Sequence, residues 1–391
     1  MRRSRLDITK YVPVALTLVV LGAGLFTVYQ AIRQTDGLAD RILALSAGLA
    51  LPDGSISIFY DSDTPEDDEI YLPDLVNENH SEDSEPVENA EDLLPSSSPP
   101  AASSSQAVPA VQTQPGAGTV QKPANAGSIL RENLHLDSAG SSLYLPFKNG
   151  LVKNSTKLSS SDISDIMQKE IAFRIYKNNK PQVLILHTHA TESFEPGTEY
   201  FDKDYNSRNR DDTQNIVSVG AIIASELEAA GIATLHDATQ HDYPSYNGSY
   251  DRSAKTIQSY LKQYPTIKVV LDIHRDAIER DGNRLSAVTR IDGKDAAQVM
   301  IISGCDDGTM NYPGWKSNLR FAARLQNEME TLFPGLTRPV MFCYRRYNQN
   351  LSSGALLIEI GSHGNTLAEA QYSGELVGKS LVSLFNQYLG K

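Results

Sequence analysis

Between Leu143 and Lys391, short apolar runs alternate with longer segments of helical periodicity. Five of the runs predict strands, at Val183–Leu186, Val269–Ile273, Val299–Ser303, Val340–Tyr344 and Ala355–Ile360. Helices are expected where apolar residues recur every three or four positions, over 213–231, 253–264, 318–335 and 373–389. Strands that alternate with helices favour a mainly parallel sheet with helices on both faces. The sequence therefore predicts one α/β domain over residues 143–391.

Polar side chains gather at the ends of three of these expected strands. They are His187, His189, Glu192, Asp272, His274, Arg275, Asp276, Glu359, His363 and Asn365. Because ligands bind beyond the carboxyl ends of parallel strands, we expect these side chains to lie close together. Two histidines and a carboxylate with an open fourth position are typical of a catalytic zinc site. A histidine that follows a strand is also often a simple hydrogen-bonding residue, and spacing alone leaves that alternative open.

Glu359 is the sharpest of these signals, because it interrupts the apolar run "LLIEIG". An ionised carboxylate is costly to bury unless it is paired, lies near a metal or has a raised pKa. A separate carboxylate within reach of a metal-bound water is what a metal-dependent hydrolase needs. The alternative is that the strand lies at a sheet edge and Glu359 faces solvent.

The N-terminus has the pattern of a membrane anchor. Residues 1–10 carry four basic side chains, and the charge-free run 11–32 follows them. Twenty-two helical residues span ~33 Å, enough to cross a bilayer core of ~30 Å. The basic flank predicts a cytoplasmic N-terminus, with the rest of the chain exported. A cleaved signal peptide is the alternative, although its apolar core is usually shorter, at about 7–15 residues.

Residues 33–142 have the composition of a disordered stalk. No Lys or Arg occurs from Ile42 to Gln121, and fifteen Asp and Glu lie between Asp53 and Asp92. Those fifteen charges exceed the chain's net charge of −13, so the remainder is close to neutral. A nucleic-acid partner needs a clustered basic face, which the sequence lacks. The rest of the stalk is rich in Pro, Ser and Ala, a composition that cannot bury enough apolar surface to fold.

The chain has two cysteines, Cys305 and Cys343. Neither lies in a spacing typical of a metal site. In an exported domain they could form a disulfide or remain free thiols, and the sequence does not decide between these states.

Four stretches of the sequence resemble the stage II sporulation protein P family, membrane-anchored cell-wall hydrolases of endospore-forming bacteria. They read "HTHATESF", "HDATQHDYPSYNGSYDRS", "VVLDIHRDA" and "RYNQNLSSGALLIEIGSHGNTLAEA". The family is similar to zinc-dependent N-acetylmuramoyl-L-alanine amidases. The resemblance covers roughly Leu143 to the end of the chain, and the anchor and stalk fit the family's layout. It implies an amidase-like α/β fold and a Zn²⁺ cofactor.

The amidase pattern assigns roles to four residues of this chain. The two zinc histidines fall on His189 and His274, and the catalytic glutamate falls on Glu359. Asn365 takes the place of an asparagine that we expect to contact substrate. The third amidase ligand is a glutamate near the start of the following helix, where this chain has aspartates instead.

The third ligand is therefore expected elsewhere. Glu192 is our first choice, since it lies three residues from His189, and Asp212 is the alternative. Arg275 is expected to be catalytic, because a guanidinium beside the metal suits an amide oxyanion or a peptide carboxylate. A structural pairing of Arg275 with a neighbouring aspartate is the alternative. His187 is expected to contact substrate or to orient a neighbour.

The resemblance implies a peptidoglycan hydrolase that cleaves the amide between N-acetylmuramic acid and L-alanine of the stem peptide. It would act in septal wall thinning and engulfment during sporulation, with stage II sporulation proteins D and M as partners. The expected location is the cell membrane, with a single-pass anchor and an extracytoplasmic catalytic domain. Two alternatives stay open. One is a zinc endopeptidase that cuts peptide cross-links, and the other is a non-catalytic wall-binding scaffold.

Overall fold

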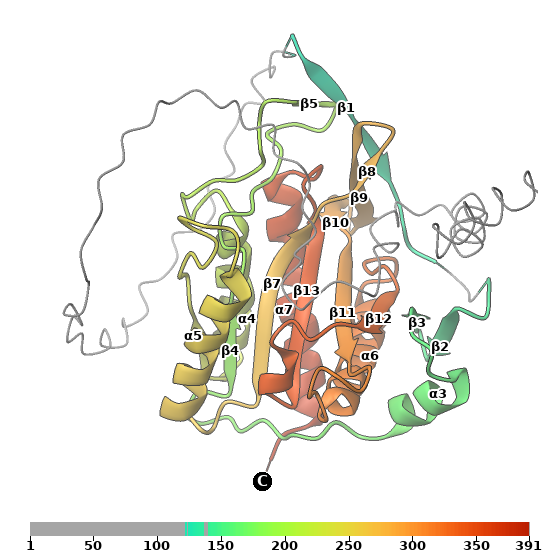
Figure 1. The fold of residues 1–391 in the computed structure, drawn as a ribbon, viewed down its shortest axis with the longest axis vertical. Helices are drawn as coiled ribbons and strands as arrows, with labels where there is room; N and C mark the ends of the chain where they lie inside the picture. The colour runs from blue at the N-terminus through green and yellow to red at the C-terminus, as the bar shows by residue number, and fades with distance from the viewer. Residues whose placement is uncertain (1–121, 123, 137–139, 391) are drawn as a thin grey trace, which may run out of the picture. The chain divides into compact units, whose positions relative to one another are not determined.

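The computed structural model describes residues 122, 124–136 and 140–390 (Figure 1). The predicted anchor at 11–32 and most of the predicted stalk lie outside these residues. Within the described part of the chain, no helix combines the length and apolar character needed to cross a bilayer. Cys305 and Cys343 are both free thiols.

The larger of two sheets contains all five strands that the sequence predicts. Among the described residues it has eight strands, in the spatial order β2 (Tyr144–Phe147), β3 (Gly150–Asn154), β12 (Val340–Tyr344), β11 (Val299–Cys305), β13 (Gly354–Ser362), β7 (Val269–Asp276), β4 (Val183–Leu186) and β6 (Thr234–His236). β3 is antiparallel to β2, and β13 is antiparallel to β11, whereas the other neighbours are parallel. The sheet is mixed, so the prediction of a mainly parallel fold is wrong.

The direction of β13 follows from a short connection. A parallel neighbour needs a crossover of about a dozen residues or more, usually a helix. Only residues 345–353 join β12 to β13, and they hold a single 3₁₀ turn, η3 (Gln349–Leu351). β13 therefore returns antiparallel to β12 and β11, which makes it parallel to β7 on its other side.

A smaller mixed sheet was not expected. Its strands are β10 (Lys294–Ala297), β9 (Asn283–Ile291), β1 (Ala126–Glu132) and β5 (Tyr200–Asp202), with β8 (Glu279–Arg280) paired to β9. β1 lies within the predicted stalk 33–142, so the predicted domain boundary at residue 143 is too late. Only Gly127 and Ile129 of β1 are buried, and this alternation is too short to stand out beside a Pro/Ser-rich segment.

Helices cover both faces of the larger sheet. Val183, Ile185 and Ile273 pack in the main core with α3 (Ser160–Gln168), α4 (Ile216–Ala229), α6 (Trp315–Leu332) and α7 (Leu367–Gln387). Leu184, Leu186 and Val270 point the other way and pack against Ile257 of α5 (Ser249–Gln263). Side chains of a strand alternate between the two faces of a sheet. The residues in line with Leu184, Leu186 and Val270 therefore lie on the face that α5 covers.

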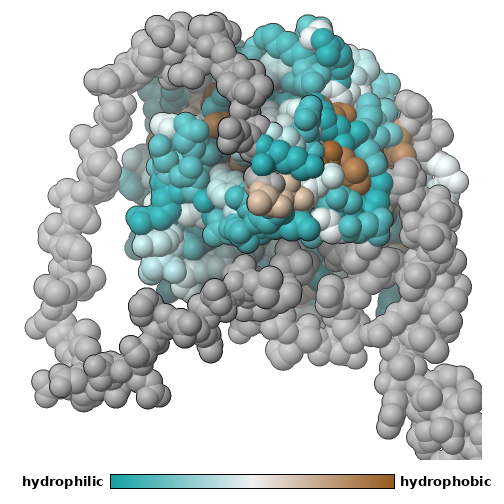
Figure 2. All heavy atoms as spheres, turned by 90° about the horizontal axis from the view of Figure 1, so that it is seen from above, coloured by the Kyte–Doolittle hydropathy of each residue, from teal (hydrophilic) through white to brown (hydrophobic). Residues whose placement is uncertain are grey.

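Figure 2 looks onto the end of the molecule at which β5 and β8 lie in Figure 1. The visible surface of the described residues is mostly hydrophilic, with small separate hydrophobic areas. β7 and β13 both run toward this end of the sheet, so their carboxyl ends and the side chains that follow them lie here.

Candidate metal centre

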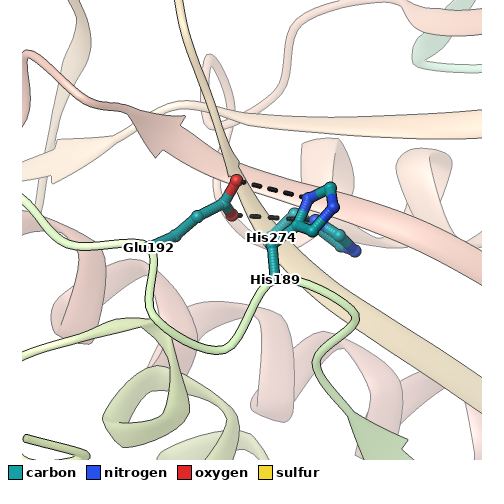
Figure 3. A group of neighbouring side chains, drawn as sticks. All are labelled: His189, Glu192 and His274. Carbon is teal, nitrogen blue, oxygen red and sulfur yellow. Dashed lines mark ion pairs between the residues drawn. The ribbon is translucent and has the colours of Figure 1, made fainter. Parts of the chain in front are cut away.

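Three of the predicted ligands lie together: His189, Glu192 and His274 (Figure 3). Glu192 Oε1 lies 3.7 Å from His189 Nδ1, and Glu192 Oε2 lies 3.6 Å from His274 Nδ1. All three side chains are at most 8% exposed. Asp212, the alternative third ligand, lies outside this group and accepts a hydrogen bond from Gln240 Nε2 instead.

Two neighbouring parallel strands bring these side chains together. β4 pairs with β7, with Leu186 opposite Asp272, so the loop after β4 starts beside the carboxyl half of β7. In that loop a tight turn closes between Glu192 N and His189 O, which are 3.1 Å apart. Glu192 O accepts a hydrogen bond from Ile216 N at the start of α4, at 2.8 Å. The loop is thus tied to a helix, and the ligand positions are fixed by backbone hydrogen bonds.

Asp272 orients His274 from behind. Its Oδ1 lies 2.9 Å from His274 Nε2, so that the other ring nitrogen, Nδ1, faces Glu192. Asp272 also accepts hydrogen bonds from Thr188 N and Thr188 Oγ1, at 2.8 and 2.6 Å. Burial acts to raise the pKa of Asp272, but His274 and Thr188 outweigh it and hold the pKa below its usual value. A carboxylate behind a histidine is a common second partner of metal-ligating imidazoles.

Glu359 lies beside the group on β13. It is the register partner of His274 on β7, and register partners in adjacent strands project to the same face of a sheet. Its Oε2 is buried and has no hydrogen-bond partner in the part of the chain that the structure describes. Burial, together with the charge of Asp276, raises the pKa of Glu359 to about 8, and His274 opposes this. The prediction that Glu359 faces the site rather than solvent fits this geometry.

The charges of the site favour an added cation. Although burial acts to lower it, the carboxylates of Asp272 and Glu192 raise the pKa of His274 to about 10. Both His274 and Glu359 therefore favour their protonated forms, which is the response of a site with excess negative charge. Ligands that surround a zinc ion tetrahedrally at about 2.0–2.2 Å lie roughly 3.3–3.6 Å from one another. The spacings of 3.6 and 3.7 Å involve different oxygens of Glu192, and one ligand atom from each of the three residues lies within 4.8 Å of the other two, so the donor set can close around a divalent cation.

Arg275 contacts the candidate ligand Glu192, since its Nη1 lies 3.9 Å from Glu192 Oε1. Its backbone N donates to Glu192 Oε2 at 3.0 Å, and its guanidinium donates to Ser193 O and Ser207 O, each at 3.0 Å. It forms neither of the aspartate pairs that the sequence left open, since Asp276 pairs with Arg338 at 2.9 Å. The catalytic role expected for Arg275 stays a prediction. The side chain fixes the ligand loop and the carboxylate of Glu192.

His187 and Asn365 are both fully buried. His187 lies on the α4 side, with Nδ1 2.8 Å from Ile273 O and Nε2 3.0 Å from His236 Nε2. The side chain of Asn365 donates to Ala287 O and accepts from Ser362 N. Both side chains are hydrogen-bonded within the protein, which fits the orienting role expected for His187, and their contacts with substrate stay predictions.

Aromatic side chains around the metal group were not predicted. Tyr246 stacks on the ring of His189, with centroids 4.5 Å apart and an interplanar angle of 23°. Tyr250 meets His189 edge-on at 5.5 Å, and Tyr347 lies 5.3 Å from Tyr250. The available signal was the cluster of tyrosines in "HDYPSYNGSY", which has no period that assigns a role.

The fold and the site define an α/β protein with a candidate metal centre of two histidines and one glutamate. The chain belongs to the stage II sporulation protein P (SpoIIP) family, whose model matches residues 103–381. It is 29% identical over 205 residues to stage II sporulation protein P of Bacillus subtilis (strain 168). This match covers 49% of the chain and 48% of that protein, so the chain spans about half the length of the curated relative.

Solved structures of amidases are similar at a lower level. The CwlD amidase of Clostridioides difficile, in complex with the GerS lipoprotein, is 12% identical with a TM-score of 0.33, over 53% of this chain and 98% of that one. The apo form of the N-acetylmuramyl-L-alanine amidase Ami1 of Mycobacterium abscessus is 14% identical, with a TM-score of 0.33. That match covers 54% of this chain and 100% of the amidase. At these TM-scores the likeness carries no conclusion about activity.

Proposed function

We propose that the protein is a zinc-dependent peptidoglycan hydrolase that cleaves the amide between N-acetylmuramic acid and L-alanine of the stem peptide. The observation that carries the proposal is the convergence of His189, Glu192 and His274 beside Glu359, whose Oε2 is buried. Membership of the SpoIIP family supports an action on the wall during sporulation. The hydrophilic face at the carboxyl ends of β7 and β13 suits a glycopeptide polymer (Figure 2).

His189, His274 and Glu192 would hold the ion. Zinc accepts two imidazoles and one carboxylate as protein ligands and keeps a fourth position open in catalytic sites. Bound there, it would polarise the amide carbonyl and acidify a water molecule. Asp272 would keep the ring of His274 in the tautomer that leaves Nδ1 for the metal, and Arg275 would hold Glu192 in place.

Glu359 would carry the proton. Its carboxylate takes a proton from the attacking water as the water oxygen bonds to the carbonyl carbon. The carbon–nitrogen bond then breaks, and Glu359 returns the proton to the departing nitrogen of L-alanine. A cation bound by the three ligands would favour the ionised form of Glu359 and would oppose the effect of burial, which raises its pKa.

We also propose that residues 11–32 anchor the protein in the cell membrane, with residues 1–10 in the cytoplasm and the catalytic domain outside. Stage II sporulation proteins D and M are proposed as partners on the family resemblance alone. A protease-protection experiment on intact cells tests the orientation. Digestion of the catalytic domain by external protease supports it, and full protection overturns it.

The activity is tested with the purified full chain. Metal content is measured first, and purified sacculi are then digested with and without a chelator. Free lactyl groups that form on the glycan without the chelator, and do not form with it, support a metal-dependent amidase activity. Split dimeric peptides would assign an endopeptidase instead. A chain that binds no metal and releases no products would be a wall-binding scaffold.

A further inference from the structure

A short segment between β6 and α5 passes over the candidate metal group. It comprises residues His241–Gly248, and we call it the strap. Its residue Tyr246 stacks face to face on the imidazole of His189 at 4.5 Å, while Tyr250 of α5 meets the same ring edge-on. His189 is 6% exposed, whereas Tyr246 is 37% exposed. The tyrosine thus forms the outer layer of the site over one ligand.

The first half of the strap is bonded to the loop that carries His189 and Glu192. Asp242 accepts hydrogen bonds from Thr191 Oγ1 and Thr191 N, at 2.6 and 3.2 Å. His241 Nδ1 lies 2.9 Å from His187 O, and because a carbonyl only accepts, this nitrogen carries the proton. His241 Nε2 is then left to accept from Thr256 Oγ1 of α5, at 2.9 Å.

The second half of the strap is held by one side chain of α5. The guanidinium of Arg252 donates to three strap carbonyls, His241 O at 2.6 Å, Asn247 O at 3.0 Å and Ser245 O at 2.5 Å. Gly248 is the last residue of the strap, and its φ of +79° lies in the left-handed region. It lies against the guanidinium of Arg252. Because a guanidinium presents its donors in a rigid fork, these bonds fix the strap's curvature.

Arg208 contacts both halves of the strap, at Asp242 and at Tyr246. Its Nη1 lies 2.7 Å from Asp242 Oδ2 and 3.2 Å from Thr191 Oγ1. Its guanidinium carbon lies 4.6 Å from the ring centroid of Tyr246. The ring is therefore held by His189 and by a cation, and the cation belongs to the network that links the strap to the ligand loop.

We propose that Tyr246 is a positioning residue for His189, held in place by the strap and by Arg252, and that it keeps His189 Nδ1 directed at Glu192 and His274. The inference rests on the proposed metal centre and extends it. A histidine side chain has two free torsions, and a flat ring stacked on it removes the orientations in which the imidazole plane tilts away from Glu192. Partners that orient a ligand typically contribute about 10- to 100-fold to metal affinity.

Metal affinity of the full chain tests the proposal directly. Co²⁺ is titrated into the metal-free protein, its visible absorption is recorded, and affinity is measured by competition with a chelator. Tyr246→Ala is expected to weaken binding about 10- to 100-fold and to change the absorption spectrum. Tyr246→Phe keeps the aromatic ring and is expected to retain the wild-type Co²⁺ affinity and the wild-type absorption spectrum. Arg252→Gln keeps the tyrosine but frees the strap, and is expected to weaken binding in the same direction.

Tyr243→Ala is the matched control. Tyr243 lies in the same strap, is 46% exposed and stacks under Arg210 rather than on a ligand. Its loss is expected to leave Co²⁺ affinity unchanged, and circular dichroism of each metal-free variant checks the fold. Wild-type affinity in Tyr246→Ala, or equal losses in Tyr246→Phe and Tyr243→Ala, overturns the positioning role while leaving the metal centre intact. A wild-type chain that binds no Co²⁺ overturns both.

Discussion

Asp272 and Glu359 flank His274 in opposite electrostatic states. Asp272 accepts hydrogen bonds from Thr188 and faces His274 Nε2, and its pKa lies below the usual value. Glu359 has a buried oxygen without a hydrogen-bond partner among the described residues, and its pKa is raised to about 8. Carboxylates whose environments separate their pKa values in this way commonly divide the tasks of orientation and proton transfer. This contrast supports Glu359, rather than Asp272, as the proton carrier.

Substitution of these residues separates metal binding from proton transfer. Glu359→Gln is expected to retain bound zinc and to lose wall digestion by at least about 100-fold, since general acid–base catalysis contributes roughly 10²- to 10⁴-fold. His274→Ala is expected to lose both, because a ligand is removed. Zinc content and lactyl-group release are measured on the same preparations. Normal digestion of wall by Glu359→Gln would show that the proton carrier is another group.

His363 gives the fold a specific pH dependence. Burial lowers the pKa of His363 to about 4, although Glu279 opposes this. In the unfolded chain the pKa returns to the ordinary histidine value of 6.5, so the unfolded state binds the proton more tightly. Stability from this group is complete above pH 6.5 and falls as pH drops to about 4, by at most about 3 kcal/mol.

Urea denaturation of wild type and His363→Gln between pH 7 and pH 4 measures this contribution. The difference in unfolding free energy between the two proteins is expected to shift by that amount across the window. Parallel curves at all pH values would show that His363 does not titrate between the two states.

The candidate ligands could be predicted from the sequence, whereas the roles of their neighbours could not. His189, Glu192 and His274 follow buried strands, and parallel neighbours place strand ends together. His187 lies two residues before His189, which suggests a shared face. His187 continues the alternation of Val183 and Ile185 and points to α4, but β4 ends at Leu186 and the chain turns, so the two-residue period no longer applies to His189.

At the scale of elements, α4 lies unusually close to the strand ends it covers. Gly220 of α4 faces His187, and a Cβ at this position would lie 2.5 Å from His187 Cε1 and Nε2. His187 in turn contacts Ile273 O, next to the ligand His274. Because Gly220 has no side chain, α4 packs directly against His187, which in turn contacts β7.

Gly220→Ala tests this close approach. Alanine favours a helix over glycine by about 1 kcal/mol, but overpacking a filled core costs about 1–3 kcal/mol. The clash should prevail, because both nitrogens of the His187 ring are engaged and the ring cannot move away. We expect a net loss of about 1 kcal/mol in unfolding free energy. Ser225→Ala, at an exposed site of α4, is the control and should not destabilise; a stabilised Gly220→Ala would contradict the packing argument.

Elements with continuous burial were predictable, and short or half-exposed ones were not. β4 and β12 have the predicted bounds because their apolar runs are bounded by polar residues. β5 and β8 span three and two residues, too few for any period to appear. Strand direction was missed because it depends on the connection before β13, whose short length was visible between the two predicted strands but was not used.

At the scale of the whole molecule, β1 connects the segment before residue 143 to the C-terminal half. Residues 129–132 pair with 284–287 of β9. Arg131 Nη1 lies 2.7 Å from Glu369 Oε1 of α7, and Leu134 N donates to the side chain of Gln298 at 2.6 Å. Ile129 and Leu134 are both buried. The folded unit therefore includes a strand that composition assigned to the stalk.

Two truncated chains test this boundary. A chain of residues 122–391 is expected to match the full chain in its urea midpoint. A chain of residues 143–391 is expected to lose at least about 3 kcal/mol, because two buried aliphatic side chains contribute about 1.5–3 kcal/mol each. Equal midpoints for the two truncated chains would place β1 outside the cooperative unit.

The position of β13 has a consequence for biosynthesis. The strand comes late in the chain, yet it lies between β7 and β11 and supplies Glu359 to the site. A nascent polypeptide cannot assemble the centre of its sheet until this segment has left the ribosome. If the protein cuts the cell wall as proposed, a chain that stops before Glu359 has neither this central strand nor the proposed proton carrier, and is expected to be inactive.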